Sequence, residues 1–338
     1  MFWVAGITPG WGHPGHEQDP GTAAGGLPAP RIRITEEGNQ RIIEANGLPN
    51  HPTGRFPNPG NPNSIQPQNY LFHMPLQPAT NSFFTPVERQ PVGVALNGVV
   101  FDPGTAEYWQ NNPASGWRKE GIVEGKGTLG MDRNMAHVQP SGAYHYHGIP
   151  LGLVEQLPGS GRKLIGYAAD GFPIYTQEKE DRSSYRLKSG NRPGGAHGPG
   201  GRYDGTYTED YEFVSGGGNL DEANGRTGVT PEYPAETYFY IVTEEFPFYP
   251  RQLKGTPDPS FQRNVPGTGP ASGGKSGAGP VARFDRDDDG KISKEEAPPP
   301  MQRNFSRHDT NGDGFIDADE AKSLPRPGQG GMQGPPPN

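Results

Sequence analysis

Two groups of side chains near the carboxyl end of the chain have the types and spacing of ligands for a hard cation. In each group, short polar side chains stand on alternate residues and a glutamate closes the group. The first group is Asp285, Asp287, Asp289, Ser293 and Glu296, and the second is Asp309, Asn311, Asp313, Asp317 and Glu320. Calcium takes about six to eight oxygen ligands at about 2.3–2.6 Å, and this spacing supplies them. The sequence therefore predicts two bound calcium ions.

The spacing is that of two EF-hand loops, in which the ligands occupy positions 1, 3, 5, 7, 9 and 12. Gly290 and Gly314 stand at the sharp turn of position 6. Position 7 is Lys291 in the first loop and Phe315 in the second, and each would contribute its backbone carbonyl. The residues at position 8 of paired loops form a short antiparallel bridge, so we expect Ile292 to face Ile316.

The helices that flank these loops must be short. The loops begin only 24 residues apart, and prolines at 298–300 interrupt the segment between them. Residues that precede proline are forced out of the helical region, while proline is tolerated in a first helical turn. We therefore expect entering helices over 281–284 and 301–308. So little helix favours a structural or tethering role over that of a sensor that opens an apolar groove.

A second group of ligand types lies near the middle of the chain, where three histidines fall within eleven residues. His145 and His147 are two apart and share one face of a strand. If 140–142 form a three-residue hairpin loop, His137 lies directly opposite His145. Opposed Cβ atoms are about 4.5–5.5 Å apart, close enough for imidazoles to share an ion at about 2.0–2.1 Å each. The pattern predicts a three-histidine metal site.

Other interpretations of this segment stay open. A four-residue loop would turn His137 to the opposite face, which carries the tyrosines, and the three rings could simply be half-buried strand histidines stacked on aromatic side chains. The identity of the metal is also open. The same register pairs Met135 with His147, and a nearby thioether would favour copper, whereas its absence would favour zinc.

Three further residues are weaker candidates as ligands. Asp170 could be a fourth ligand or a base, but its position before Gly171 is also explained by turn chemistry. His51 and His73 lie in segments that could approach the histidine cluster. No phosphate-binding loop, dinucleotide fingerprint, nucleophile elbow or His-Glu-x-x-His motif is present.

The elements that must position these residues are mostly strands. Alternation predicts a hairpin over 31–45, and Asn97-Gly98 and Asp170-Gly171 are two-residue hairpin turns between apolar runs. Residues 238–243 form another strand, and no helical period of ten or more residues precedes position 280. We predict a mainly β fold, an antiparallel β-sandwich-like domain with long loops, plus a small α EF-hand pair on a flexible linker.

Composition divides the chain further. Its 338 residues include 52 glycines and 40 prolines, which gather outside the strand-like segments. We expect a flexible arm over 1–29, the β domain over 30–253, a Gly/Pro/Ser linker over 254–280, the EF-hand pair over 281–324 and a disordered tail over 325–338.

Charge and residue content exclude several classes of function. The net charge of −8 and the lack of a basic cluster argue against nucleic acid as a partner. There is no cysteine, so disulfides, thiolate ligands and cysteine nucleophiles are excluded. No apolar run approaches the roughly 20 residues of a membrane span, and the first residues show no signal-peptide pattern.

Several blocks of the sequence together resemble a known family. The run HVQPSGAYHYHG at 137–148 closely resembles the signature of the YHYH-domain family, which is named for its tetrapeptide. The runs GLPNHPTG at 47–54, VGVALNG at 92–98, IGYAADGFPIY at 165–175 and LDEANGR at 220–226 are similar to its other characteristic blocks. The resemblance covers roughly 31–252 and implies no established reaction. It does imply a bacterial chain exported to the periplasm or cell exterior, where an envelope or extracellular partner is expected.

Two classes of function follow. The first is a non-catalytic metal-binding envelope protein whose EF-hand tail uses external calcium to order itself and to dock to a partner. The alternative is a metal-dependent enzyme, hydrolytic or copper redox, using His137, His145 and His147 with an open coordination position. An enzyme requires the three histidines at the bottom of a concave pocket, whereas a structural site is closed and buried.

Overall fold

The computed structural model describes residues 26–87, 90–262, 291–294, 297, 302, 305–317 and 320. The chain divides into two compact units, Met1–Arg263 and Asn264–Asn338. Residues 1–25 of the expected arm, most of the expected linker and the expected tail lie outside the described residues. In the described part of the chain, every helix falls short of the length and apolar character that crossing a bilayer requires.

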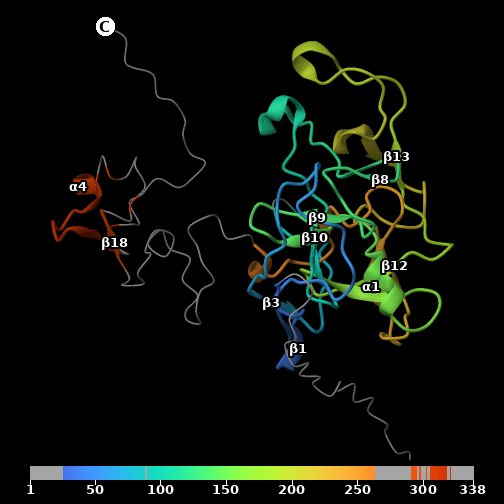
Figure 1. The fold of residues 1–338 in the computed structure, drawn as a ribbon, viewed down its shortest axis with the longest axis horizontal. Coiled ribbons are helices and arrows are strands. Elements are labelled where there is room, and N and C mark those ends of the chain that lie inside the picture. Colours follow the sequence, from blue (N-terminus) through green and yellow to red (C-terminus); the bar gives the residue numbers. More distant parts are fainter. Residues whose placement is uncertain are drawn as a thin grey trace, which may run out of the picture. The chain divides into compact units, whose positions relative to one another are not determined.

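The main sheet of the first unit has eight strands in the order β15-β16-β12-β11-β5-β6-β10-β9. Figure 1 labels β9, β10 and β12 of this sheet. Two neighbouring pairs, β10 with β6 and β12 with β16, are parallel, and the remaining pairs are antiparallel. In sheet order the strands are Gly225–Gly228, Thr237–Val242, Pro173–Thr176, Leu164–Ala168, Gly93–Ala95, Val100–Phe101, Tyr144–Tyr146 and Ala136–Val138. The strand predicted over 238–243 is β16, shifted by one residue.

A second sheet contains β1 (Ile32–Glu37), β2 (Gln40–Ala45) and β3 (Tyr70–Pro75). The hairpin predicted over 31–45 is confirmed by the antiparallel pairing of β1 with β2. Buried Ile43 and Phe72 of this sheet belong to one hydrophobic core with Val94 and Phe101 of the main sheet. The prediction of a mainly β, sandwich-like domain is therefore confirmed.

Two glycines allow the sheet to turn where the sequence predicts hairpins. Gly98, with φ +82°, lies between β5 and β6, and its N–H donates to the Ala95 carbonyl at 2.8 Å. Gly171, with φ +91°, lies between β11 and β12, and its N–H donates to the Ala168 carbonyl at 2.9 Å. Both residues occupy the left-handed region, which other residue types rarely adopt. A hairpin is confirmed at both places, but each loop has three residues, 96–98 and 169–171, instead of the predicted two, since the N–H groups of Ala95 and Ala168 donate to the Val99 and Phe172 carbonyls at 2.8 Å each.

Smaller elements connect the strands. The helix α1 (Leu151–Gln156) has only six residues, consistent with the lack of a helical period in this part of the sequence. The other elements of this unit are the strand pairs β4 (Thr85–Pro86) with β17 (Gln252–Leu253), β7 (Ile122–Val123) with β8 (Lys126–Gly127) and β13 (Tyr185–Leu187) with β14 (Tyr211–Phe213), and the 3-10 turns Trp109–Asn111, Pro113–Ser115, Gly195–His197, Thr208–Asp210 and Pro259–Phe261.

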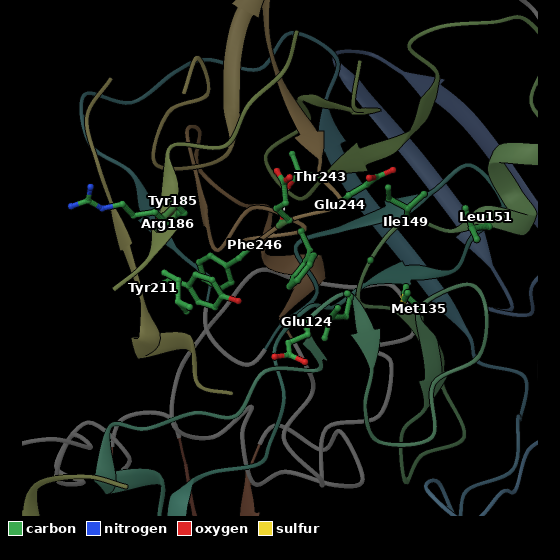
Figure 2. Close-up of a pocket in the computed structure, with 16 residues that line it drawn as sticks. Glu124, Met135, Ile149, Leu151, Tyr185, Arg186, Tyr211, Thr243, Glu244 and Phe246 are labelled. Atoms are coloured by element: carbon green, nitrogen blue, oxygen red, sulfur yellow. Dashed lines mark hydrogen bonds between the residues drawn. The ribbon is translucent and has the colours of Figure 1, made fainter. Parts of the chain in front are cut away.

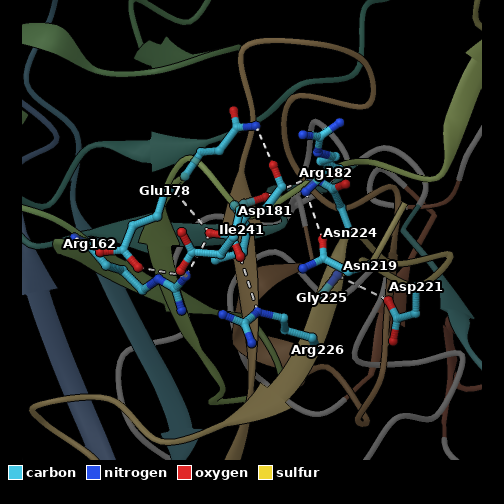
Figure 3. A network of polar contacts seen from close by, with 12 residues as sticks. Arg162, Glu178, Asp181, Arg182, Asn219, Asp221, Asn224, Gly225, Arg226 and Ile241 are labelled. Carbon is cyan, nitrogen blue, oxygen red and sulfur yellow. Dashed lines mark hydrogen bonds and ion pairs between the residues drawn. The ribbon is translucent and has the colours of Figure 1, made fainter. Parts of the chain in front are cut away.

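A buried carboxylate anchors the loops beyond β12. The Asp181 side chain is fully buried and pairs with Arg162 at 2.7 Å and with Arg226 at 3.1 Å (Figure 3). The same carboxylate accepts the backbone N–H of Glu178 at 2.9 Å. Because Arg226 lies on β15 and Arg162 precedes β11, this network fastens one edge of the main sheet to its centre.

The folded unit continues past the predicted start of the linker at residue 254. Phe261 is 1% exposed, and its ring stacks on Phe72 with 4.3 Å between centroids. The backbone N–H groups of Lys254 and Gly255 donate to Tyr240 and Asp170 at 2.7 and 2.8 Å. The predicted boundary lies too early because the Pro- and Ser-rich composition of this stretch concealed one aromatic anchor.

The described part of the second unit contains β18 (Ile292–Ser293), β19 (Phe315–Ile316) and α4 (Phe305–His308). The two strands are antiparallel, and Ile292 is the direct partner of Ile316. This bridge confirms the pairing expected from position 8 of the two loops. The helix α4 falls within the second predicted entering helix, while the first, at 281–284, lies outside the described residues.

Candidate metal centre

The hairpin of β9 and β10 places the histidines in the predicted register. His145 is the direct cross-strand partner of His137. The loop between the strands has three residues. The Gln139 N–H donates to the Ala143 carbonyl at 2.9 Å, and the Gly142 N–H donates to the Gln139 carbonyl at 2.8 Å. The alternative four-residue loop, which would have moved His137 to the tyrosine face, is therefore wrong.

The three imidazole rings converge through their Nε2 atoms. His145 Nε2 lies 2.9 Å from His147 Nε2, which in turn lies 3.1 Å from His137 Nε2. The other nitrogen of each ring points away, toward a backbone carbonyl. These Nδ1 contacts are His137 to Leu129 at 3.0 Å, His145 to Ala143 at 3.2 Å and His147 to Pro103 at 3.3 Å.

The Nδ1 contacts favour one position for the ring protons. A carbonyl only accepts, so the Nδ1 atoms of His145 and His147 donate to it and their Nε2 atoms keep a lone pair, whereas His137 Nδ1 faces both the Leu129 carbonyl and the Asn61 amide nitrogen. When the His137 ring has its proton on Nδ1 as well, His147 Nε2 faces the lone pairs of both other rings at hydrogen-bond distance with no proton between them. That arrangement is repulsive by itself and becomes favourable when a cation occupies the centre. Carbonyl partners of this kind commonly orient histidine ligands of metals.

Burial keeps the rings in the neutral form that binds metal. His145 and His147 are each 2% exposed, and His137 is partly exposed at the sheet edge. Burial lowers the pKa of His145 to about 3, and lowers the pKa of His147 well below its usual value with help from the neighbouring histidines and Arg251. The pKa of His137 is lowered by the same desolvation.

The three histidines form the only such ligand group in the described part of the chain, with all ligand atoms within 4.8 Å of one another. No carboxylate belongs to it. The site is therefore an all-nitrogen, uncharged donor set in a buried place. Imidazole ligands of this type suit zinc and copper, whereas calcium and magnesium prefer oxygen.

Asparagine side chains support the edge strand, and the sequence analysis missed them. The amide nitrogens of Asn61 and Asn63 donate to the Val138 carbonyl at 2.9 and 2.8 Å. Asn61 Nδ2 also lies 3.2 Å from His137 Nδ1. The Asn- and Pro-rich stretch before residue 70 was the available signal, since amides can satisfy the open edge of a strand.

A glycine behind His147 was also missed. A Cβ at Gly121 would lie 2.7 Å from His147 Nδ1 and 2.8 Å from Met131 Cε. Distances this short do not occur for real side chains. A residue with a Cβ at position 121 would therefore displace the His147 ring, and only glycine fits there. A single glycine in a loop carries no such signal in the sequence.

Met135 lies opposite His147, as the register predicted, and its carbonyl accepts the His147 N–H at 2.7 Å. Its side chain, however, packs with Ile122 and Phe246 and lines a cleft. The thioether thus belongs to an apolar cluster beside the strand. Its position gives no reason to prefer copper over zinc.

Asp170 lies at its turn and outside the histidine group. Its carboxylate accepts hydrogen bonds from the Tyr240 hydroxyl and from the N–H groups of Gly255 and Phe172, the last two at 2.8 and 3.3 Å. Burial raises its pKa to about 6. The residue therefore joins the last segment of the domain to the β11–β12 turn.

The remaining candidate histidines also lie apart from the group. His51 Nε2 lies 2.6 Å from the Tyr146 hydroxyl, on the face of β10 opposite the ligands. His73 lies on β3, where its Nδ1 is 3.2 Å from the Gln40 side-chain oxygen. Neither belongs to the converging cluster.

The carboxylates of the second predicted calcium loop accept backbone N–H groups of the same loop. Asp309 accepts N–H groups from Gly312, Asp313 and Gly314 at 2.7–3.1 Å. Glu320 closes the loop by accepting the N–H groups of Asp317, Asn311 and Thr310 at 2.8–3.0 Å, and these bonds lower its pKa to about 2. Of the first loop, Asp285, Asp287, Asp289 and Glu296 lie outside the described residues.

The fold and the site define a mainly β protein with a buried three-histidine cluster, followed by a pair of calcium-type loops. Comparison with known families agrees with this description. The YHYH protein family matches residues 71–255, more than half of the chain, and the EF hand family matches 282–296 and 305–324. The chain belongs to the YHYH protein family. Comparisons with curated proteins and with solved structures gave no match.

Proposed function

We propose that the YHYH domain holds one transition-metal ion on the Nε2 atoms of His137, His145 and His147. The observation that carries this proposal is the approach of His147 Nε2 to the Nε2 atoms of His145 and His137, at 2.9 and 3.1 Å, with a backbone carbonyl beside each Nδ1. Nitrogen ligands at about 2.0–2.1 Å from one ion lie roughly 3 Å apart. A small rearrangement therefore suffices for binding.

Zinc and copper are the two ions that best suit this donor set. Both accept imidazole nitrogen, and neither requires a carboxylate. The neutral rings bring no charge of their own, so the ion's charge must be balanced by more distant groups. Asp132 raises the pKa of His137, which marks it as one such group.

A structural or storage role fits the surroundings of the cluster better than catalysis. His145 and His147 are almost fully buried. Neither the cleft of about 670 Å³ beside β9 nor the shallow hollow at Arg55 is lined by a histidine of the cluster. An enzyme of the alternative class needs the ion exposed at the bottom of a pocket.

The EF-hand match supports calcium binding by the second unit. We propose that it binds two ions through the loops beginning at Asp285 and Asp309. Millimolar calcium outside the cell would keep such loops filled, so we further propose a periplasmic or extracellular location and an envelope partner for the tail. Cell fractionation with antibody detection tests the location, and recovery of the protein in the cytoplasmic fraction alone would contradict it.

Metal analysis of protein purified without added metal tests the three-histidine site. Wild type and the control variant His73→Ala should retain about one zinc or copper per chain. His145→Ala and His147→Ala should lose it while keeping calcium, because the calcium loops use other residues. Equal transition-metal content in all four proteins would overturn the proposal, and so would its absence from wild type even after refolding with either metal.

A further inference from the structure

A cleft of about 670 Å³ opens beside the histidine hairpin, between the β13–β14 pair and the segment that contains β7 and β8 (Figure 2). Its lining includes Met135, which directly precedes β9, and Gly148, which directly follows His147. The histidine cluster does not line it, so its occupant is a separate question. Its volume is that of a typical small-molecule site.

One wall of this cleft is aromatic. Tyr211 stacks on Phe246 with 3.9 Å between ring centroids and 1° between their planes, and Tyr185 meets the edge of the same stack at 5.3 Å. At two margins, Leu151 and Leu187 are each 42% exposed. These surfaces would bury the apolar body of a ligand.

The charged groups of the cleft are almost all of one sign. Glu124, Glu244 and Glu245 are exposed and line it, and within the described residues their carboxylates form no ion pair. Arg186 is the one basic residue of the lining. Its guanidinium points away from the cleft and pairs with Glu212 at 2.9 Å (Figure 2). The rim therefore offers negative potential to whatever enters.

We infer that this cleft binds a small organic cation, an amine or quaternary ammonium with an apolar or aromatic body. The apolar wall would pack against the body of the ligand, and the three carboxylates would attract its positive charge. An anion of the same shape is repelled by the rim, and a neutral analogue gains the wall contacts alone. Each exposed carboxylate contributes modestly, roughly two- to fivefold in affinity, because solvent screens it.

Calorimetric titration of the full chain with three probes of similar shape tests this inference. The probes are 2-phenylethylammonium, neutral 2-phenylethanol and anionic 3-phenylpropanoate. The amine should bind at least about fivefold more tightly than the alcohol, and the anion should bind most weakly. Added salt should reduce the advantage of the amine and leave the alcohol unchanged.

Variants locate the binding. The triple substitution of Glu124→Gln, Glu244→Gln and Glu245→Gln should reduce the affinity of the amine to that of the alcohol, whereas Glu155→Gln, which changes an exposed acid outside the cleft that pairs with Arg133, should change neither affinity. Leu187→Ala should weaken the amine and the alcohol together. Equal affinity for all three probes, no binding at millimolar concentration, or binding insensitive to the cleft variants would overturn the inference.

Discussion

The three histidine rings are held by contacts on the side away from the proposed ion. Each Nδ1 faces a carbonyl of a different backbone segment, so the orientation of each ring is fixed before any metal arrives. His145 and His147 are buried and neutral, which removes competition between protons and metal near pH 7. The individual residues therefore define a preorganised nitrogen donor set.

Gly121 should be required for metal affinity although it offers no ligand. The Cβ of Gly121→Ala would overlap the His147 ring, so we expect metal affinity to fall about 10- to 100-fold, the usual cost of disturbing a supporting residue. Competition with a chromophoric chelator measures this. Gly194→Ala is the matched control, since a Cβ there meets no atom within 4 Å. Unchanged affinity in Gly121→Ala would contradict the proposed position of His147.

Asp170 should make the domain more stable in mild acid. Its pKa rises from 3.8 to about 6 on folding, so between these values the folded chain binds more protons than the unfolded chain. The free energy of unfolding should therefore fall as pH rises from about 4 to about 6, by up to about 3 kcal/mol. Urea unfolding of wild type and Asp170→Asn across this range isolates the effect. Parallel pH profiles for the two proteins would exclude it.

At the scale of elements, the β9–β10 hairpin followed directly from the sequence. Alternation put His145 and His147 on one face, and the three-residue loop put His137 opposite them. The positions of the turns at Gly98 and Gly171 followed in the same way, but their loop length of three residues did not. What could not be predicted was non-local: the parallel pairing of β10 with β6, which brings the Pro103 carbonyl to His147, and the asparagines that cover β9.

The segment after β17 shows a second limit of sequence reasoning. Its composition is that of a linker, yet Phe261 fills a site against Phe72. One aromatic residue can anchor a short polar stretch, and neither periodicity nor propensity reports it. The same limit applies to Gly121, whose role depends on a ring that is 26 residues away in the sequence.

Phe261→Ala should destabilise the β domain by about 3–5 kcal/mol, the usual range for a buried phenylalanine. Phe83→Ala is the control, because Phe83 is 70% exposed. Chemical denaturation of the two variants gives the comparison. If the Phe261 variant unfolded at the same denaturant concentration as wild type, residues 254–262 would be a linker after all.

At the scale of the whole molecule, the chain combines two kinds of ligand-type side chains. The β domain offers neutral nitrogen in a buried place, and the second unit offers carboxylate oxygen in paired loops joined by Ile292 and Ile316. Nitrogen favours zinc or copper and oxygen favours calcium, so the two ions should not compete. The calcium loops therefore explain the composition of the second unit only. The function of the β domain must come from its own histidine site.

Removing calcium should affect the second unit alone. We expect a chelator selective for calcium to increase amide hydrogen exchange across 291–317 and to leave exchange across 30–262 unchanged. Asp309→Ala should bind one calcium ion instead of two. Segment-resolved exchange by mass spectrometry, with calorimetry for the stoichiometry, measures both. A large change in the β domain would show that calcium also controls its fold.

The most direct test of the central claim is X-ray absorption at the edge of the bound transition metal. A site formed by His137, His145 and His147 predicts about three nitrogen neighbours at about 2.0–2.1 Å, with the multiple scattering of imidazole rings. His145→Ala should abolish that signal. A first shell of oxygen or sulfur, or an imidazole signal that survives the substitution, would contradict the account.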